Sequence, residues 1–291
     1  MRRKICSCDF RTSAIHGGRR CGRSSAAKYL MPSLQPKKRF GQHFLHDRGI
    51  VQRILDAFDP QPEAALVEIG PGPGALTRPL LERCARLHVV ELDRDLAAQL
   101  RTDFAPERLV VHEADALKFD FGALAKPGGK IRLIGNLPYN ISTPLLFHLL
   151  DQERCIHDML FMLQKEVVDR MAAPPGGKDY GRLSVMIQWG LRVEKLFDVR
   201  PGAFTPPPKV DSSVVRLVPH AAPPVAVHDA NAFAHVVKAS FAQRRKTLRN
   251  NLKGLMTAVI LESLGIDPQR RAETLTLAEF AALANVLPPA S

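Results

Sequence analysis

The sequence lacks the features of a membrane protein and of a disulfide-stabilised secreted protein. No uninterrupted apolar run approaches the roughly 18 to 20 residues that a membrane-spanning helix requires. Three of the five cysteines lie in residues 1–30, and Cys84 and Cys155 stand singly in apolar stretches. This distribution argues against a disulfide framework and favours a reducing, cytoplasmic location.

Acidic residues are scarce in residues 1–30, where eight Lys/Arg face only Asp9, so this segment carries about +7 of the formal net charge of +12. Its cysteines lack the fourth ligand and the two-residue gap typical of zinc sites, so we expect no metal. The segment has the arginine and serine content of a transit peptide but no amphipathic stripe. Because Met31 offers a second start, we expect residues 1–30 to be a disordered leader or an upstream extension.

The body of the sequence alternates helical and strand-like patterns from residue 48 onward. Five apolar runs, "AALVEIG", "RLHVVEL", "RLVVHEA", "IRLIGN" and "IHDMLFML", are mostly separated by helical stretches. Such alternation predicts an α/β fold with a parallel sheet covered on both faces, which strands near 193–199 and 212–218 extend. After a proline-alanine linker the pattern is helical, so we predict a sheet domain at 31–220 and an all-α domain at 221–291.

A glycine-rich turn, "VEIGPGPGAL", places Gly70, Gly72 and Gly74 between a buried strand and a helix. Glycines there permit tight turning and close approach of the backbone to a ligand. The spacing differs from the dinucleotide fingerprint, and Glu68 would repel a pyrophosphate docked on the following helix. A ligand that carries an amine suits this turn better.

Two more carboxylates follow the next strands along the chain. Glu91 lies about 20 residues beyond the first glycine, where a carboxylate can accept both hydroxyls of a ribose, and Asp115 could accept a hydrogen bond from an adenine amine. Taken singly, each is better explained as a solvated strand end or a helix cap, as Asp93 is. Together they serve an amine, a ribose and an adenine with nothing for phosphates, which describes S-adenosylmethionine.

The stretch "LIGNLPYNIS" ends the next strand in a rigid polar turn. Asn136 Oδ1 and the carbonyl of Leu137 can accept the two hydrogens of an exocyclic amine, Pro138 fixes the turn, and Tyr139 offers a stacking face. We therefore predict a methyl transfer governed by positioning, with no general base beside the amine. A nucleophilic cysteine, which methylation at a cytosine carbon needs, is absent from the strand-end loops.

These motifs occur in a fixed order from "KKRFGQHFLHD" through "GNLPYNIS" and "FTPPPKVDSSVVRL" to "FAQRRKTLRNNL", over residues 37–253. The set resembles the rRNA adenine N6,N6-dimethyltransferases, specifically the bacterial small-subunit enzymes. The resemblance implies a Rossmann-like class I S-adenosylmethionine-dependent methyltransferase sheet with a small C-terminal all-α domain. It also implies a monomer that dimethylates two adjacent adenosines, in a hairpin near the 3′ end of 16S rRNA within an immature small ribosomal subunit.

The resemblance also assigns residues. It places His43 and Leu45 in the cofactor pocket together with Gly70, Glu91, Asp115 and Asn136. The family often has Asn where this chain has His43, which can donate or accept as an amide does but could also be an exposed loop residue. Phe204 resembles a second aromatic that clamps the target base against Tyr139, or it is an apolar plug.

A basic run, "VKASFAQRRKTLRNNLKG", contains no acid and is predicted to form a helix and its end. A solvated face is the ordinary interpretation of such a run, but the missing carboxylates favour phosphate binding. We therefore expect RNA contacts from Arg244, Arg245, Lys246 and Arg249, with Lys37, Lys38 and Arg39 near the pocket mouth.

Two other functions fit parts of the sequence. A large-subunit rRNA adenine methylase of the antibiotic-resistance type shares the fold and the "NLPY" turn, but "FTPPPKVDSSVVRL" and the longer helical segment favour the small-subunit enzyme. A non-catalytic RNA-binding assembly factor would carry a vestigial pocket. The intact Asn136, Tyr139, Glu91 and Asp115 argue against that alternative.

Overall fold

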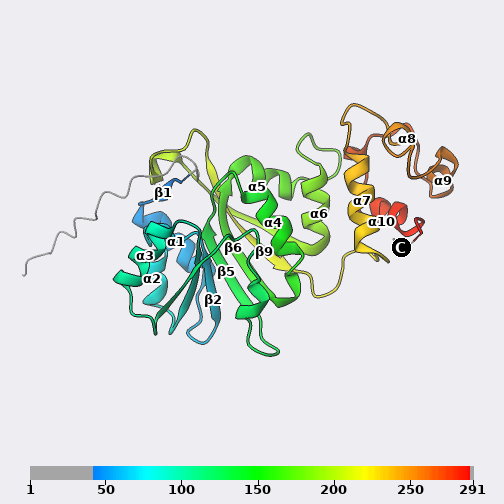
Figure 1. The fold of residues 1–291 in the computed structure, drawn as a ribbon. Helices are drawn as coiled ribbons and strands as arrows, with labels where there is room; N and C mark the ends of the chain where they lie inside the picture. Colours follow the sequence, from blue (N-terminus) through cyan, green and yellow to red (C-terminus); the bar gives the residue numbers. More distant parts are fainter. Residues whose placement is uncertain (1–41, 289–291) are drawn as a thin grey trace, which may run out of the picture. The chain divides into compact units, whose positions relative to one another are not determined.

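The protein is described here from a computed structural model that covers residues 42–288. The predicted leader at 1–30 and the residues Lys37, Lys38 and Arg39 lie outside this range. In the described part, seven strands form one sheet in the order β4-β3-β2-β5-β6-β9-β7 (Figure 1). Their bounds are β2 Ala65–Ile69, β3 Leu87–Glu91, β4 Leu109–Glu113, β5 Ile131–Asn136, β6 Ile156–Gln164, β7 Leu191–Val199 and β9 Ser212–Pro219.

Five of these strands, β4, β3, β2, β5 and β6, run parallel to their neighbours. Strand β9 pairs antiparallel with both β6 and β7 at the other edge. The α/β fold predicted from the sequence is confirmed, including the two strands that extend the sheet. Residues 159–163 of β6 form a continuous buried apolar run, because helices cover both faces of this strand.

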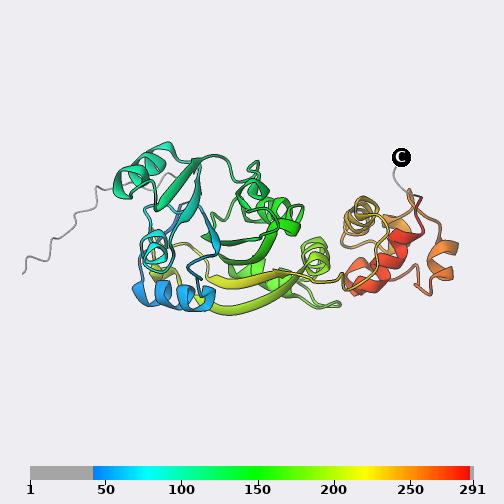
Figure 2. The same cartoon turned by 90° about the horizontal axis from the view of Figure 1, so that it is seen from below.

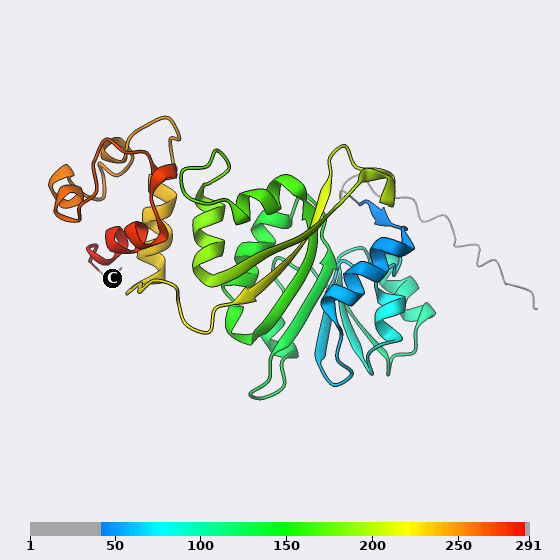
Figure 3. The ribbon, with the colours of Figure 1, turned by 180° about the vertical axis from the view of Figure 1, so that it is seen from behind.

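Two helical layers cover the sheet. Helices α1, α2 and α3 pack on one face and α4, α5 and α6 on the other, each layer with its own apolar cluster (Figure 2). Figure 3 shows α1 beside β7 and β9, where Arg53 stacks on the ring of Phe197 at 3.9 Å. The bounds are α1 Arg48–Phe58, α2 Thr77–Leu81, α3 Arg94–Asp103, α4 Ser142–Leu150, α5 Lys165–Ala172 and α6 Arg182–Gly190.

Helix α1 illustrates why these segments are helical. Its buried side chains Ile54, Leu55 and Phe58 recur at the spacing that places them on one helix face. Asp47 caps the start by accepting hydrogen bonds from the backbone N–H groups of Gly49 and Ile50, at 2.8 and 3.1 Å. The helix therefore begins immediately after the segment that will form one wall of the site.

All regular elements after β9 are helical in the described residues: α7 Ala230–Ser240, α8 Leu248–Asn251, α9 Ala258–Ser263, a short 3-10 helix at Ala272–Thr274 and α10 Leu277–Asn285. Their apolar side chains join the same core as α6, with the rings of Trp189 and Phe233 4.9 Å apart. The division of the chain into two domains near residue 220 stays a prediction. No helix within 42–288 is long and apolar enough to cross a lipid bilayer.

A second, two-stranded sheet was not predicted. Strand β1 (Phe44–Leu45) pairs antiparallel with β8 (Phe204–Thr205), so residues about 160 positions apart are joined. The backbone N–H of His46 also donates to the carbonyl of Ala203 at 3.0 Å. This pairing holds the segment before α1 near the carboxyl ends of the parallel strands.

The strand order of the sheet reverses between β2 and β5. Strands β3 and β4 lie on one side of β2, and β5 and β6 lie on the other. In open α/β sheets, ligands bind outside the carboxyl ends of the strands at such a reversal. The glycine turn follows β2 there, and the "NLPY" turn follows β5.

Candidate active site

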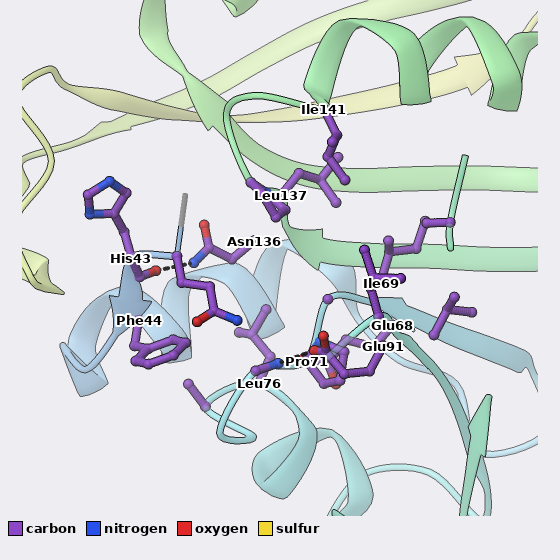
Figure 4. Close-up of a pocket in the computed structure, with 18 of the residues that line it drawn as sticks. His43, Phe44, Glu68, Ile69, Pro71, Leu76, Glu91, Asn136, Leu137 and Ile141 are labelled. Carbon is purple, nitrogen blue, oxygen red and sulfur yellow. Dashed lines mark hydrogen bonds between the residues drawn. The ribbon is translucent and has the colours of Figure 1, made fainter. Parts of the chain in front are cut away.

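A cleft opens at this reversal point and contains about 1090 Å³ of empty space, including the part that is open to solvent. Its walls come from the turns after β2, β3, β4 and β5 and from the β1 segment (Figure 4). Among the described residues that line it are three carboxylates, those of Glu68, Glu91 and Asp115, and no Lys or Arg. The cleft therefore suits a neutral or cationic ligand and disfavours a phosphate-bearing one.

The glycine turn forms the floor of the cleft. Gly70, Gly72 and Gly74 have φ of +66°, +56° and +89°, a backbone region that other residues rarely adopt. A side chain on Gly72 would also lie 3.4 Å from the ring of Phe44. The three glycines are thus needed for the turn itself and for the close approach of the β1 segment.

Gly135 brings the second turn alongside the first. A Cβ atom at Gly135 would lie 2.5 Å from the carbonyl oxygen of Ile69, closer than any real contact. Only glycine therefore lets the end of β5 lie this close to the end of β2. The Pro138 ring then lies 3.8 Å from where a Cβ atom on Gly70 would be. Because the two turns lie this close together, the glycine turn and the "NLPY" turn are parts of one site.

Glu91 ends β3 and is almost fully buried. Its Oε2 accepts the backbone N–H of Gly72 at 3.2 Å and its Oε1 accepts that of Asp93 at 2.9 Å. Burial raises the pKa of this carboxyl, and the two backbone donors partly offset that effect. These bonds hold a carboxyl group rigidly at the cleft wall, where it can accept hydroxyl hydrogens from a ligand.

Glu68 lies deeper, with 1% of its surface exposed. The hydroxyl of Thr77 donates to its Oε2 at 2.7 Å. Burial, opposed by the Thr77 hydrogen bond and aided by the nearby charge of Glu91, raises the pKa of Glu68 to about 8. The acid is therefore held largely protonated near neutral pH, and a cationic amine beside it would favour its ionised form.

Asp115 follows β4 and reaches the cleft as predicted. Its Oδ1 accepts the backbone N–H of Leu117 at 2.9 Å, which orients the side chain. Leu92 lies next to Glu91 and also lines the cleft, with 50% of its surface exposed. Sequence reasoning missed Leu92, because a single leucine after a strand carries no signal of its own.

Asn136 has one fixed orientation. Its Nδ2 donates to the carbonyl oxygen of His43 at 3.0 Å, shown as a dashed line in Figure 4. Because a carbonyl only accepts, this bond identifies which end of the amide is the nitrogen. Oδ1 is left as the acceptor in this cleft-lining residue, and its contact with a target amine stays a prediction.

The rest of the turn is equally constrained. The backbone N–H of Leu137 donates to the carbonyl of Met162 on β6 at 3.1 Å. The carbonyl of Pro138 accepts both the hydroxyl of Ser142 at 3.0 Å and the backbone N–H of Ile141 at 3.2 Å. Strand β6 and helix α4 thus hold the four residues Asn136, Leu137, Pro138 and Tyr139 at the mouth of the cleft.

His43 lies in the cleft wall, and its ring makes contacts within the protein. Its Nδ1 lies 2.7 Å from the carbonyl of Pro206, so Nδ1 carries the hydrogen. The ring centroid is 5.5 Å from that of Tyr139, with the planes at 31°. Leu45 also lines the cleft and is buried. Both residues thus line the cleft, and the backbone of His43 makes the contact to Asn136, while their contact with the cofactor stays a prediction.

The structure does not bring Phe204 to the cleft. Its side chain is 2% exposed, belongs to the apolar cluster under α1, and is absent from the cleft lining. The backbone of Phe204 pairs with Leu45, which points the ring into the core. The clamp prediction is therefore not supported by this geometry, and the alternative of an apolar plug describes the residue.

The basic run is also folded differently from the prediction. Helix α7 ends at Ser240, so Arg244, Arg245 and Lys246 lie in the turn before α8, which contains Arg249. The guanidinium of Arg244 donates to the carbonyl of Lys178 and lies 3.8 Å from Glu273. No ion pair within residues 42–288 involves the side chains of Arg245, Lys246 or Arg249. Arg244 thus has a structural partner that the other three lack.

The fold and the acid-lined cleft at its reversal point define a class, the S-adenosylmethionine-dependent methyltransferases. A family model for ribosomal RNA adenine dimethylase matches residues 33–288. The chain belongs to this family, whose members are S-adenosylmethionine-dependent adenine dimethyltransferases that act on rRNA. The family predicted from the sequence motifs is confirmed.

Curated relatives and solved structures agree with this assignment. The chain is 60% identical over 250 residues to the ribosomal RNA small subunit methyltransferase A of Laribacter hongkongensis, covering 86% of this chain and 95% of the relative. It is 56% identical over 252 residues to the protein of the same name from Pseudomonas aeruginosa, covering 86% and 94%.

Two solved structures share most of the fold at 25% identity. A dimethyladenosine transferase from Plasmodium falciparum gives a TM-score of 0.69, covering 83% of this chain and 96% of that one. The 23S rRNA methyltransferase ErmE gives 0.63, covering 84% and 99%. The large-subunit enzyme is thus a much more distant relative in sequence than the small-subunit enzymes, which favours the small subunit over the rival prediction.

Proposed function

We propose that this chain transfers methyl groups to the N6 amines of two adjacent adenosines, in a hairpin near the 3′ end of small-subunit rRNA, and dimethylates each. We further propose that it works as a cytoplasmic monomer on an immature small ribosomal subunit. The small-subunit names of the relatives at 54–60% identity support the choice of RNA. The orientation of the Asn136 amide supports the choice of an adenine amine.

The three carboxyl groups of the cleft fit S-adenosylmethionine. In this proposal Glu91 accepts the ribose hydroxyls, Asp115 accepts the adenine amine and Glu68 lies nearest the amino-acid end. The lining residues within 42–288 include no Lys or Arg, which suits a cofactor that carries a positive sulfur and an ammonium group. When bound, that cofactor supplies a methyl group on a sulfonium, which is an activated donor.

Asn136 is the residue that orients the nucleophile. Its Nδ2 is held by the His43 carbonyl, so Oδ1 accepts one hydrogen of the target amine, and the Leu137 carbonyl accepts the other. These two acceptors aim the nitrogen lone pair away from the ring plane. The rate enhancement then comes chiefly from fixing the reacting atom in position, and from acceptors aligned with the charge that develops on the amine.

Tyr139 provides the flat surface on which the extruded adenine stacks. Aromatic stacking contributes about 1–3 kcal/mol per base, and the ring is half-buried with its hydroxyl fixed. Stacking on Tyr139 offsets the stacking that the base loses when it leaves the RNA.

The proposed phosphate contacts are Arg245, Lys246 and Arg249, because no ion pair in the described chain involves their side chains.

The direct test compares small-subunit rRNA from cells with and without the gene by mass spectrometry. We expect the adjacent N6,N6-dimethyladenosines to disappear when the gene is deleted and to return when it is supplied again. Complementation with an Asn136→Ala variant should leave them unmethylated. Unchanged dimethyladenosine in the deletion strain would contradict the proposal.

A further inference from the structure

The hydroxyl of Tyr139 has a partner that neither the motif nor the reaction accounts for. It lies 2.7 Å from the hydroxyl of Ser212, the first residue of β9. Ser212 is fully buried, at 0% exposure, and is separated from Tyr139 by 73 positions in the chain. Stacking needs only an aromatic face, so a phenylalanine could stack as well. The hydroxyl pair therefore has a purpose other than stacking itself.

Ser212 is held in place on both sides of its strand. In register, it is paired with Gln164 at the end of β6 and with Val199 at the end of β7. The carbonyl of the preceding residue, Asp211, also accepts the backbone N–H of Lys165 at 2.9 Å. Its hydroxyl is consequently a rigid anchor point inside the sheet. Tyr139 lies in a turn between β5 and α4, where a ring has more freedom.

From this geometry we propose that Ser212 is a positioning residue for methyl transfer, which fixes the ring plane of Tyr139 so that its face meets the target base. The inference rests on the proposed stacking role of Tyr139 and adds to it. The ring is then held at two places, by Ser212 at its hydroxyl and by the His43 ring 5.5 Å from its centroid. A ring fixed before the base arrives loses less conformational freedom on binding.

The neighbouring serine supplies a matched control. Ser213 is also fully buried, and its hydroxyl donates to Asp198 Oδ1 at 2.5 Å. Successive residues of a strand point to opposite faces, so Ser213 faces away from Tyr139. Alanine at either position removes one buried hydroxyl and one hydrogen bond. The two changes should destabilise the fold similarly, but only the one at position 212 should affect the tyrosine.

The experiment measures steady-state methylation of a small-subunit RNA substrate by the full-length protein, for Ser212→Ala, Ser213→Ala, Tyr139→Phe and the double variant. We expect Ser212→Ala and Tyr139→Phe each to lower kcat about fivefold, the effect of one net hydrogen bond. KM for RNA should change less than twofold. The double variant should be no slower than either single one, because both remove the same bond. Ser212→Thr keeps a hydroxyl and should restore most of the rate.

A fluorescent base gives a second readout, which a loss of stability alone would not change. With 2-aminopurine in place of the target adenine, stacking on Tyr139 quenches emission, and Ser212→Ala should weaken the quenching while Ser213→Ala leaves it unchanged. Equal effects of the two serine variants, or additive effects in the double variant, would overturn the role of Ser212. If Tyr139→Ala itself retained activity and quenching, the stacking proposal would fail instead, so the two failures are distinguishable.

Discussion

Replacing Asn136 by Asp tests the orientation of the amide more sharply than truncation to Ala. Aspartate keeps an acceptor on the cleft side but replaces Nδ2 by an oxygen, which would then lie about 3.0 Å from the His43 carbonyl. Two acceptors at that distance repel each other unless one carries a hydrogen. We therefore expect the Asn136→Asp variant to be inactive at high pH and to recover activity as the pH falls, because a protonated carboxyl can donate to His43.

The expected losses of activity and of stability follow from the two hydrogen bonds of Asn136, one to the target amine and one to the His43 carbonyl. Loss of one group aligned with developing charge lowers kcat by about 10²–10³-fold in comparable sites, so Asn136→Ala should fall in that range at every pH. Its loss of the bond to His43 should lower the free energy of unfolding by only about 1 kcal/mol. Binding of S-adenosylmethionine should change little in either variant.

The assay is single-turnover methylation between pH 6 and 8.5, with cofactor affinity measured by calorimetry in the same buffers. The ratio of Asn136→Asp activity to wild-type activity should rise steadily toward low pH, while that of Asn136→Ala stays flat. Full activity of Asn136→Asp at pH 8.5 would refute the reasoning, because it would mean that the acceptor alone suffices and that the His43 carbonyl has no orienting role.

Three further predictions concern other parts of the molecule. The raised pKa of Glu68 means that the folded state binds more protons than the unfolded state between pH 4.5 and about 8, so stability should fall as the pH rises through this window. Urea titrations of Glu68→Gln should lack this component, and an identical pH profile would contradict the assignment. Phe204→Ala should lower the free energy of unfolding by about 3–5 kcal/mol, whereas Phe204→Leu should stay active. If a stable Phe204→Leu protein lost RNA binding, the prediction that Phe204 clamps the target base would be supported instead. Arg249→Ala should reduce the salt dependence of log K for RNA by about one unit of slope, whereas Arg244→Ala should leave the slope nearly unchanged and lower the melting temperature.

The strand-end residues could be predicted because their sequence pattern is local. Glu91 and Asn136 each end a strand and Glu68 is the penultimate residue of β2, and parallel strands bring such ends to one edge of the sheet. The glycine turn could likewise be predicted, because its three glycines directly indicate a backbone with positive φ. These features made the fold and the cofactor predictable without a structure, and the roles of these residues in the reaction stay predictions.

The contacts that could not be predicted are those between distant segments. Strands β1 and β8 have two residues each, too few for any periodicity, so nothing in the sequence pairs Leu45 with Phe204. The burial of Phe204 and the bond between His43 and Asn136 both follow from that pairing. The bond from Tyr139 to Ser212 depends on the position of β9 between β6 and β7, which strand patterns alone do not determine.

The basic run illustrates a second kind of error. A segment without acids over a helical span favours a helix, but Phe241 packs against Phe280 and the side-chain amide of Asn251 donates to the carbonyl of Ser240, which together close a turn. Tertiary packing thus overrides the local helix preference. As a consequence, Arg245 and Lys246 lie in a loop instead of on a helix.

The central claim is that Asn136 Oδ1 receives the target amine while Nδ2 stays on the His43 carbonyl. A crystal structure of the protein with a cofactor analogue and an RNA hairpin measures this directly. We expect the adenine N6 atom within about 2.7–3.2 Å of both Asn136 Oδ1 and the Leu137 carbonyl, with the Asn136–His43 bond intact. An adenine bound elsewhere, or an Asn136 amide turned away from His43, would contradict the account.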